Sequence, residues 1–189
     1  MKSQKVIDLF LIILFFMFIC GCKSTPKDKT DITVNGMIYD TDNRPVVNYL
    51  IFIDGQAYGI SDIGGRFTLK KVSKGKHLLS GNGTGYLSIS QEINILDKSQ
   101  ILYLRVPSVE SRFKEAYFFI TQEEYSKAEE CIKDILLSES ENSDALFFMS
   151  LIKHLQGDKE QSLEYINRFR EKEENSKYAE ELEKLILEN

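Results

Sequence analysis

The residues of this 189-residue chain that could carry chemistry are few and scattered. Its two histidines, His77 and His154, belong to neither a His-x-x-Glu nor a His-Glu-x-x-His pattern, so they do not have the spacing of a zinc peptidase site. Acidic residues are plentiful, but the glutamate-rich run 171–174 has the pattern of a solvated helix face. We therefore expect no catalytic residues, no metal or cofactor site and no enzymatic activity.

Two stretches have some features of ligand-binding loops. Asp40–Asn43 has the alternating acidic start of a calcium loop, but Arg44 and Pro45 follow it and no glutamate closes a twelve-residue loop. Gly81–Gly85 lacks the Lys-Ser/Thr ending of a phosphate-binding loop, and no amphipathic helix starts after it. We expect the first to be a solvated hairpin and the second a tight connection between strands.

The N-terminal stretch up to Cys22 has the pattern of a membrane signal. Lys2 and Lys5 precede Leu9–Cys22, a run without a single charged residue. The length of this run suits a signal-peptide core, whereas a bilayer span needs roughly 20 apolar residues. The run ends in Ile19–Cys22, which resembles the lipobox of bacterial lipoproteins. In that motif an aliphatic residue and a small residue precede the cysteine that becomes lipidated.

The resemblance implies that residues 1–21 are removed and that Cys22 carries the acyl chains. Residues 22–31 are polar, contain Pro26 and predict a flexible tether. The protein would then be lipid-anchored in a bacterial cell envelope. The outer membrane is favoured where a cell has two, because Lys23 is not the aspartate that retains lipoproteins in the inner membrane of enteric bacteria. The alternative is an uncleaved signal anchor.

The third cysteine has no partner for a disulfide. Cys20 would leave with the signal peptide and lipid would block Cys22, so Cys131 would remain alone. It lies among apolar helix positions, and we expect a buried structural thiol rather than a nucleophile.

Charge divides the rest of the chain into two parts. Residues 22–107 contain 11 basic and 8 acidic residues, whereas residues 108–189 contain 11 basic and 20 acidic residues. The shift predicts two domains, a β domain at 32–107 followed by an α domain at 108–189. The acidic second half argues against nucleic acid as a partner.

Residues 32–107 have the pattern of a β-sandwich. Ile32, Val34 and Ile38 recur with a period of two, and Asp54-Gly55 predicts a hairpin turn. Short strands separated by turn residues are expected at 32–38, 47–53, 66–69, 77–80, 87–95 and 101–106.

Several separated elements then occur in the order seen in the carboxypeptidase regulatory-like domain, which this stretch resembles over most of its length. The resemblance implies a transthyretin-like, seven-stranded Greek-key sandwich that is not itself catalytic. A PEGA-type envelope β-domain is the alternative. The matching elements are Asn35-Gly36, Asp40, Arg44-Pro45-Val46, Ile53-Asp54-Gly55, Ser61-Asp62, Gly65–Leu69, Val72, Gly75, His77–Leu79 and Gly85-Tyr86.

After Pro107 the apolar period changes from that of a strand to that of a helix. Thr121–Glu124 has the sequence of a capping box for the second helix. The first helix face comprises Val109, Phe113, Ala116, Tyr117 and Ile120, and the second comprises Tyr125, Ala128, Ile132 and Ile135.

The helical pattern returns with a period of about 34 residues, the length of a tetratricopeptide unit. Ala116 corresponds to Ser150, and Ala128 corresponds to Ser162. The resemblance to tetratricopeptide repeats implies two α-hairpin units, 109–142 and 143–176, and a capping helix at 177–188. The apolar side of that last helix would cover the second repeat through Tyr178, Leu182, Leu185 and Ile186.

The first helix of each repeat is expected to line a concave face where solenoids commonly hold partners. The candidate partner-binding residues are Phe113, Tyr117, Phe147, Leu151 and His154. The alternative is that these side chains only pack against neighbouring helices.

These expectations favour a membrane-anchored interaction or scaffold protein whose partners are other envelope proteins. A second hypothesis is that the sandwich binds carbohydrate or peptidoglycan through the exposed tyrosines Tyr58, Tyr86 and Tyr103. Tryptophan, the commonest sugar-binding platform, is absent from the chain.

Overall fold

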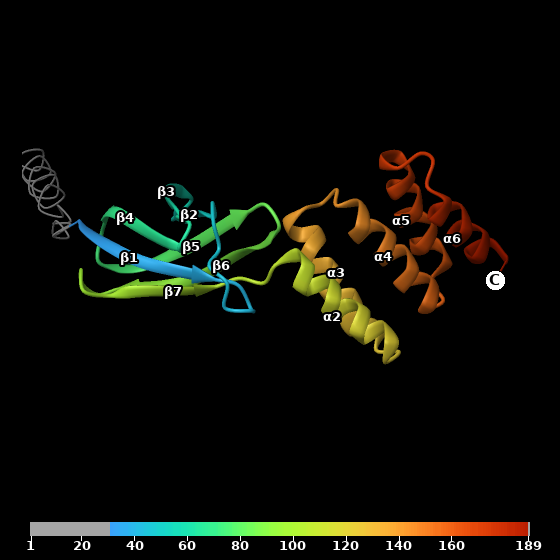
Figure 1. The fold of residues 1–189 in the computed structure, drawn as a ribbon, viewed down its shortest axis with the longest axis horizontal. Coiled ribbons are helices and arrows are strands. Elements are labelled where there is room, and N and C mark those ends of the chain that lie inside the picture. Colours follow the sequence, from blue (N-terminus) through green and yellow to red (C-terminus); the bar gives the residue numbers. More distant parts are fainter. Residues whose placement is uncertain (1–30, 189) are drawn as a thin grey trace, which may run out of the picture. The chain divides into compact units, whose positions relative to one another are not determined.

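The computed structural model describes residues 31–188, in which seven strands are followed by five helices (Figure 1). The signal peptide, Cys22 and all but the last residue of the expected tether lie outside the described residues. Residues 31–188 belong to one compact unit. Within it, no helix has the length and apolar character to cross a membrane.

The strands form two sheets, as a sandwich requires. One has the order β4-β1-β7 and the other the order β3-β2-β5-β6. Strands β1 and β7 run parallel, and the other neighbours are antiparallel. The bounds are β1 Ile32–Tyr39, β2 Leu50–Ile53, β3 Gln56–Ile60, β4 Arg66–Val72, β5 Gly75–Gly83, β6 Tyr86–Ile95 and β7 Ile101–Arg105.

The sandwich core follows from the alternation of apolar residues along the strands. Val34 and Ile38 of β1 are fully buried, and so are Leu69 of β4 and Leu79 of β5. The expected sandwich-like arrangement of two sheets is therefore confirmed. The predicted turn at Asp54-Gly55 is also present, with φ of 51° and 79°, and it leads into β3, for which the sequence pattern had predicted no strand.

The glycine-rich stretch 81–85 is not only a connection between strands. Strand β5 continues to Gly83, and the side chain of Tyr49 lies against Gly81 and Gly83. A Cβ atom would lie 2.4 Å from the Tyr49 ring at Gly81 and 2.7 Å from it at Gly83. These two glycines therefore make room for a buried tyrosine, and only Gly85, with φ of 79°, serves the turn.

Five helices follow the sheets, and polar side chains cap three of their N-termini. The oxygens of Ser108, Asn142 and Asp158 accept hydrogen bonds from backbone N–H groups in the first turns of α2, α4 and α5. The bounds are α2 Val109–Thr121, α3 Tyr125–Ser138, α4 Ser143–Leu155, α5 Lys159–Lys172 and α6 Lys177–Glu188.

The predicted capping box at Thr121–Glu124 is wrong. Thr121 is the last residue of α2, and its hydroxyl donates to the Phe118 carbonyl oxygen at 2.7 Å. Glu124 precedes α3 without a side-chain capping bond. The reason is the tight connection between the helices, in which Glu123 adopts a left-handed φ of 58°.

The helices enclose two apolar cores. The first lies among α2, α3 and α4 and includes Leu87 of β6, and the second lies among α4, α5 and α6. Together with the sandwich core, these cores are built from residues between Ile32 and Ile186. Residues 31–188 thus contain their own apolar interior and should fold without the segment that precedes them.

The β and α parts are joined by contacts as well as by the chain. Leu87 packs in the first helical core, and the backbone N–H of Ser88 donates to the Ser138 hydroxyl of α3 at 2.8 Å. The Val109 N–H at the start of α2 donates to the Gly85 carbonyl oxygen at 2.9 Å. The start of β6 therefore supports the first helical hairpin.

Candidate protein-binding surface on the helices

Small residues let the paired helices approach closely. Ala116 of α2 and Ala128 of α3 are fully buried, and so are Ser150 of α4 and Ser162 of α5, which lie one repeat period further along the chain. The two serines bond across the crossing, where each hydroxyl donates to the carbonyl oxygen of the other residue at 2.8 Å. The same crossing is thus made twice, with alanines in the first hairpin and hydrogen-bonded serines in the second.

Three of the five predicted partner-binding residues are partly buried and pack against the helical cores. The Phe113 ring lies 5.4 Å from the Phe148 ring beside the first helical core. The Phe147 ring lies 5.5 Å from the Phe169 ring, and Leu151 packs beside it against the second core. Phe113, Phe147 and Leu151 thus pack between helices, and each keeps some exposed area.

The other two predicted residues lie nearer the surface. Tyr117 of α2 is 63% exposed, and His154 in the last turn of α4 is partly exposed. Of the five side chains, only Tyr117 is mostly exposed.

Large side chains nevertheless recur at one equivalent position of the first helices. Tyr117, Leu151 and Leu185 follow one another at intervals of one repeat period on α2, α4 and α6. Leu185 is 50% exposed and Leu151 is partly buried. We call these three residues the first-helix row. Leu185 was missing from the sequence-based set, although its offset from Leu151 by one repeat period marks it.

Helix α6 covers the second core with a different set of residues from the one predicted. Leu182 and Ile186 are buried as expected, and Ala179 joins them. Tyr178 and Leu185, which were also expected to pack inward, are 73% and 50% exposed. The inward face of α6 therefore begins one position later than the sequence pattern suggested.

The surface around the first-helix row is acidic. Glu110 and Asp144 stand at corresponding positions of α2 and α4, and Glu181 lies one turn before Leu185. Glu110 is paired with Lys114 at 2.5 Å, whereas Asp144 and Glu181 form no ion pair within residues 31–188. A basic partner segment would therefore find complementary charge here.

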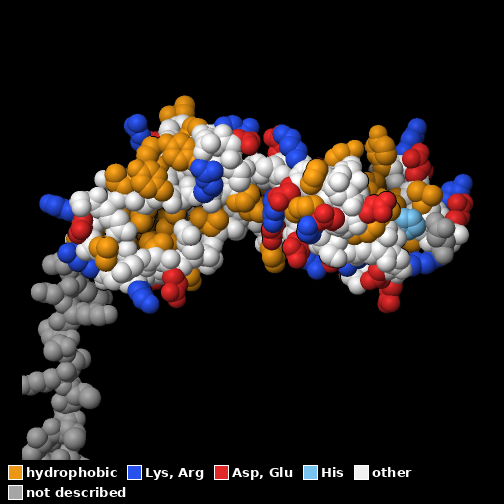
Figure 2. Space-filling model, turned by 90° about the horizontal axis from the view of Figure 1, so that it is seen from below, with side chains coloured by type: hydrophobic (Ala, Val, Ile, Leu, Met, Phe, Trp, Pro, Cys, Tyr) orange, Lys and Arg blue, Asp and Glu red, His pale blue; other side chains and the backbone are white. Residues whose placement is uncertain are grey.

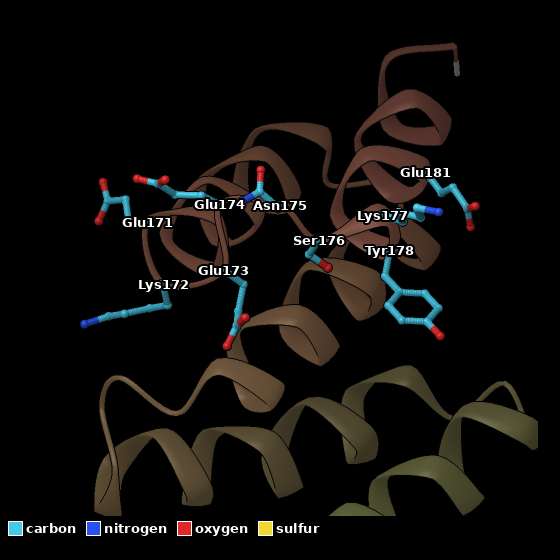
Figure 3. A pocket seen from close by; sticks show the side chains of 9 residues that line it. All are labelled: Glu171, Lys172, Glu173, Glu174, Asn175, Ser176, Lys177, Tyr178 and Glu181. Atoms are coloured by element: carbon cyan, nitrogen blue, oxygen red, sulfur yellow. The ribbon is translucent and has the colours of Figure 1, made fainter.

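The α5–α6 connection adds an acidic hollow of about 1080 Å³. Figure 3 shows Tyr178 and Glu181 on α6, across the hollow from Glu171 and Lys172 at the end of α5. Lys172 is held by Glu141 at 3.1 Å. The lining thus presents more carboxylates than free cations to solvent.

A serine, a histidine and an aspartate meet in the β region, although the sequence pattern had given no reason to expect it. His77 Nδ1 lies 2.7 Å from an Asp54 carboxylate oxygen, and His77 Nε2 lies 3.4 Å from the Ser73 hydroxyl. The same Nε2 lies 2.8 Å from the Ser73 carbonyl oxygen, a position in which it must donate a proton. It is then not available as a base for the hydroxyl, so this cluster ties two turns together rather than forming a nucleophile.

Asp54 completes that connection. Its other carboxylate oxygen accepts the Leu78 N–H at 2.9 Å. The hydrogen bond from His77 is the largest cause that lowers the pKa of the Asp54 carboxyl, and the Leu78 N–H acts in the same direction. The carboxylate is therefore held in its charged form.

In the acidic loop 40–43, the Asp40 carboxylate binds groups of its own loop and of Arg44, which follows it. Asp40 is 1% exposed, accepts the N–H groups of Asp42 and Arg44, and pairs with the Arg44 guanidinium at 2.7 Å. Burial opposes these bonds, but together they lower the pKa of Asp40. Residues 31–188 contain no group of three or more His, Cys, Asp or Glu side chains arranged to hold a metal ion.

The three tyrosines considered for carbohydrate binding lie apart. Tyr58 and Tyr86 belong to β3 and β6, the opposite edges of one sheet, and Tyr103 belongs to β7 of the other sheet. Tyr86 packs edge-on against Tyr49 with ring centroids 6.5 Å apart, and Tyr58 packs on the sandwich core. Of the three, only Tyr103 is mostly exposed, at 69%, whereas Tyr58 and Tyr86 are partly buried.

No protein-family model and no curated protein matches this chain. Solved structures show a distant likeness of fold. A cohesin–X-dockerin complex from Acetivibrio cellulolyticus is 22% identical over 39% of this chain and 51% of that one, with a TM-score of 0.29. A DUF3823 family protein from Bacteroides ovatus is 14% identical over 42% and 45%, with a TM-score of 0.34. Catechol 1,2-dioxygenase from Acinetobacter is 9% identical over 45% and 55%, with a TM-score of 0.35. This chain thus spans about half the length of each, and likenesses this distant carry no inference about function.

Proposed function

We propose that this protein is a lipid-anchored, non-catalytic interaction module of a bacterial cell envelope. Its β domain would be a carboxypeptidase regulatory-like sandwich and its helices two tetratricopeptide-like repeats with a capping helix. The lipobox-like residues Ile19–Cys22 support the anchor. The repeated close crossing, in which Ala116 and Ala128 correspond to Ser150 and Ser162 of the second hairpin, supports the helical repeats.

The observation that carries the partner-binding role is the first-helix row. It places one large side chain on each of α2, α4 and α6. Asp144 precedes Leu151 by two turns and Glu181 precedes Leu185 by one turn, and neither acid forms an ion pair in residues 31–188. A partner segment that combines apolar and basic side chains would bury the row and pair with these acids.

The row offers a matched test because each exposed member has an exposed neighbour on another face of the same helix. Tyr117 is followed by Phe118, which is 58% exposed, and Leu185 is followed two positions later by Leu187, which is also 58% exposed. The double substitution Tyr117→Asp with Leu185→Asp replaces the two exposed members of the row, and Phe118→Asp with Leu187→Asp makes a comparable change elsewhere.

Crosslinking in intact cells, followed by mass spectrometry, should recover the same partner from the wild type and the Phe118/Leu187 variant. The Tyr117/Leu185 variant should lose it. Equal recovery from both variants would contradict binding at the row. Equal loss with unchanged circular dichroism would also contradict it.

The anchor has its own test. Mass spectrometry of the protein from the membrane fraction should find a mature N-terminus at Cys22 that carries acyl chains. Cys22→Ser should leave the precursor unprocessed and without the lipid. An intact Met1 in the wild type would overturn the lipoprotein assignment and favour an uncleaved signal anchor.

A further inference from the structure

Five lysines gather at the end of the sandwich where β1 begins. Register pairs Ile32 of β1 with Val72 of β4, and Gly75 of β5 with Ile95 of β6, so these strand ends lie side by side. The turn between β4 and β5 and the loop between β6 and β7 close this end. The lysines on these segments are Lys70, Lys71, Lys74, Lys76 and Lys98, and we call them the lysine end.

The two connections of the lysine end face each other closely. The pKa of Asp97, in the β6–β7 loop, is lowered first by hydrogen bonds from Ser99 and also by the positive charge of Lys74 in the β4–β5 turn. Figure 2 shows blue side chains around the left-hand end of the β region, which is the end where β1 starts in Figure 1.

The lysines of the lysine end form no ion pairs within the part of the molecule that the structure describes. All five lysines are exposed, and none forms an ion pair within residues 31–188. By contrast, most cations of the helices are paired with carboxylates, for example Lys153 with Glu129 at 2.8 Å. Four acids lie near this end: Asp54 is engaged by His77 and Asp97 by Ser99, whereas Asp31 and Glu92 form no ion pair within residues 31–188.

Exposed apolar side chains surround the same end. Leu96 follows β6 and is 62% exposed, Ile101 begins β7 and is 51% exposed, and Leu78 of β5 is 48% exposed. Lysines next to isolated apolar side chains suit the interface of a bilayer. There the ammonium groups meet lipid phosphates, and the apolar groups reach the upper acyl region.

We propose that the lysine end docks on the surface of an anionic lipid bilayer. The inference rests on the expected membrane anchor and not on the helical partner site. Residue 31, where the described chain begins, lies at this end, and residues 23–31 can span at most about 30 Å when extended. A tether of that reach keeps the lysine end beside the membrane that holds the anchor.

The charge of the rest of the molecule favours the same orientation. Residues 108–189 carry a net charge of −9, so an anionic surface repels them and attracts the lysine end. The helices join the sandwich at the start of β6, the end of that strand opposite to Ile95. Docking therefore points the helices, and the first-helix row with them, away from the bilayer.

The experiment uses residues 23–189, which contain all three apolar cores but neither Cys22 nor the apolar run. Sedimentation with vesicles of phosphatidylcholine containing phosphatidylglycerol should show binding at low salt. Binding should weaken steeply between about 0.05 M and about 0.5 M salt, because the Debye length falls below about 5 Å. Phosphatidylcholine vesicles alone should bind at least tenfold less.

Lys74→Glu with Lys76→Glu and Lys98→Glu should lower the vesicle partition coefficient by at least about 100-fold, since each lysine contributes roughly a factor of five. Lys159→Glu with Lys177→Glu and Lys184→Glu makes the same change in net charge on the helices and should change the coefficient by less than about threefold. Circular dichroism of both variants checks the fold.

Equal binding to neutral and anionic vesicles would overturn the proposal. So would equal losses in the two triple variants, because net charge and not the lysine end would then govern binding. The Tyr117/Leu185 variant should bind vesicles like the wild type. Failure of partner capture and failure of lipid docking are therefore distinguishable.

Discussion

Ser150 and Ser162 each donate a side-chain hydrogen bond to the other's backbone carbonyl oxygen at 2.8 Å, and both residues are completely buried. This reciprocal pair lies where α4 crosses α5. A serine is only slightly larger than an alanine, so the two helices still approach closely. Each hydroxyl donates to a carbonyl oxygen on the facing helix.

The serine pair predicts a specific pattern of stability changes. Ser150→Ala or Ser162→Ala should lower the free energy of unfolding by about 1 kcal/mol each. The double variant should lose about the sum, because each hydroxyl donates to a backbone carbonyl oxygen that the other substitution leaves in place. Ser150→Leu overfills the crossing and should cost about 3 kcal/mol. Urea unfolding of residues 23–189 measures these values, and a harmless Ser150→Leu change would contradict the close crossing.

The buried Tyr49 predicts a second pattern of stability changes, this time in the β-sandwich. Its hydroxyl lies 2.7 Å from the Leu87 carbonyl oxygen and 2.9 Å from that of Gly81, and burial raises its pKa. Tyr49→Phe should cost about 1 to 2 kcal/mol through the lost hydrogen bond. Gly81→Ala should cost about 2 kcal/mol or more, because its Cβ would lie 2.4 Å from the Tyr49 ring.

The control for Gly81→Ala is Asn82→Ala, an exposed change on the same strand that should stay within about 0.5 kcal/mol. Thermal unfolding of the three variants is a sufficient measurement. If Gly81→Ala proved as mild as Asn82→Ala, the close packing of the Tyr49 ring on β5 would be wrong.

Glu129 predicts a dependence of stability on pH. Burial alone would raise its pKa, but hydrogen bonds from Lys133, Lys153 and Gln156 lower it to about 2, from a usual value of 4.5. Because the folded-state pKa is the lower one, the stabilisation is present above about pH 4.5 and is lost as the pH falls towards 2. It should reach about 3 kcal/mol at pH 7.

The measurement is the difference in unfolding free energy between the wild type and Glu129→Gln at pH 7, 5 and 3. It should be largest at pH 7 and shrink at pH 3. Glu164→Gln changes an exposed glutamate that has no ion pair in residues 31–188, and should give a difference within about 0.5 kcal/mol throughout. A constant difference for Glu129→Gln would contradict the network.

Cys131 predicts a slow thiol reaction. It is 2% exposed, and burial is the main cause that raises the pKa of its thiol. In residues 23–189, where it is the only cysteine, an alkylating reagent should react at least about 100-fold more slowly in native buffer than in about 6 M urea. Rapid native labelling would contradict the packed α2–α3–α4 core.

Local patterns predicted the elements better than their ends. The six predicted strands exist because alternating apolar residues bury one face, as Val34 and Ile38 do. Strand β3 was missed because it pairs only with β2 at a sheet edge, so none of its residues needs to be fully buried. The capping box failed at Thr121 because the helix–helix turn, and not the side chain, determines where α2 ends.

The candidate surface was likewise predicted only in part. The repeat period that relates Tyr117 to Leu151 was visible in the sequence, and so was the small residue at each helix crossing. Which face of each first helix remains exposed depends on the crossing of three helices, and that buries much of Phe113 and Phe147 while exposing Tyr178. The meeting of Ser73, His77 and Asp54 likewise depends on which turns the sheets bring together.

By itself the sequence determined the β-then-α order, the uneven charge and the helical repeat period, because these depend on residue type and spacing along one chain. Only the tertiary structure decided that Gly81 and Gly83 accommodate Tyr49 and that five lysines meet at one end of the sandwich. Those relationships join residues far apart in the sequence, and their positions follow from strand register and helix packing rather than from any local pattern.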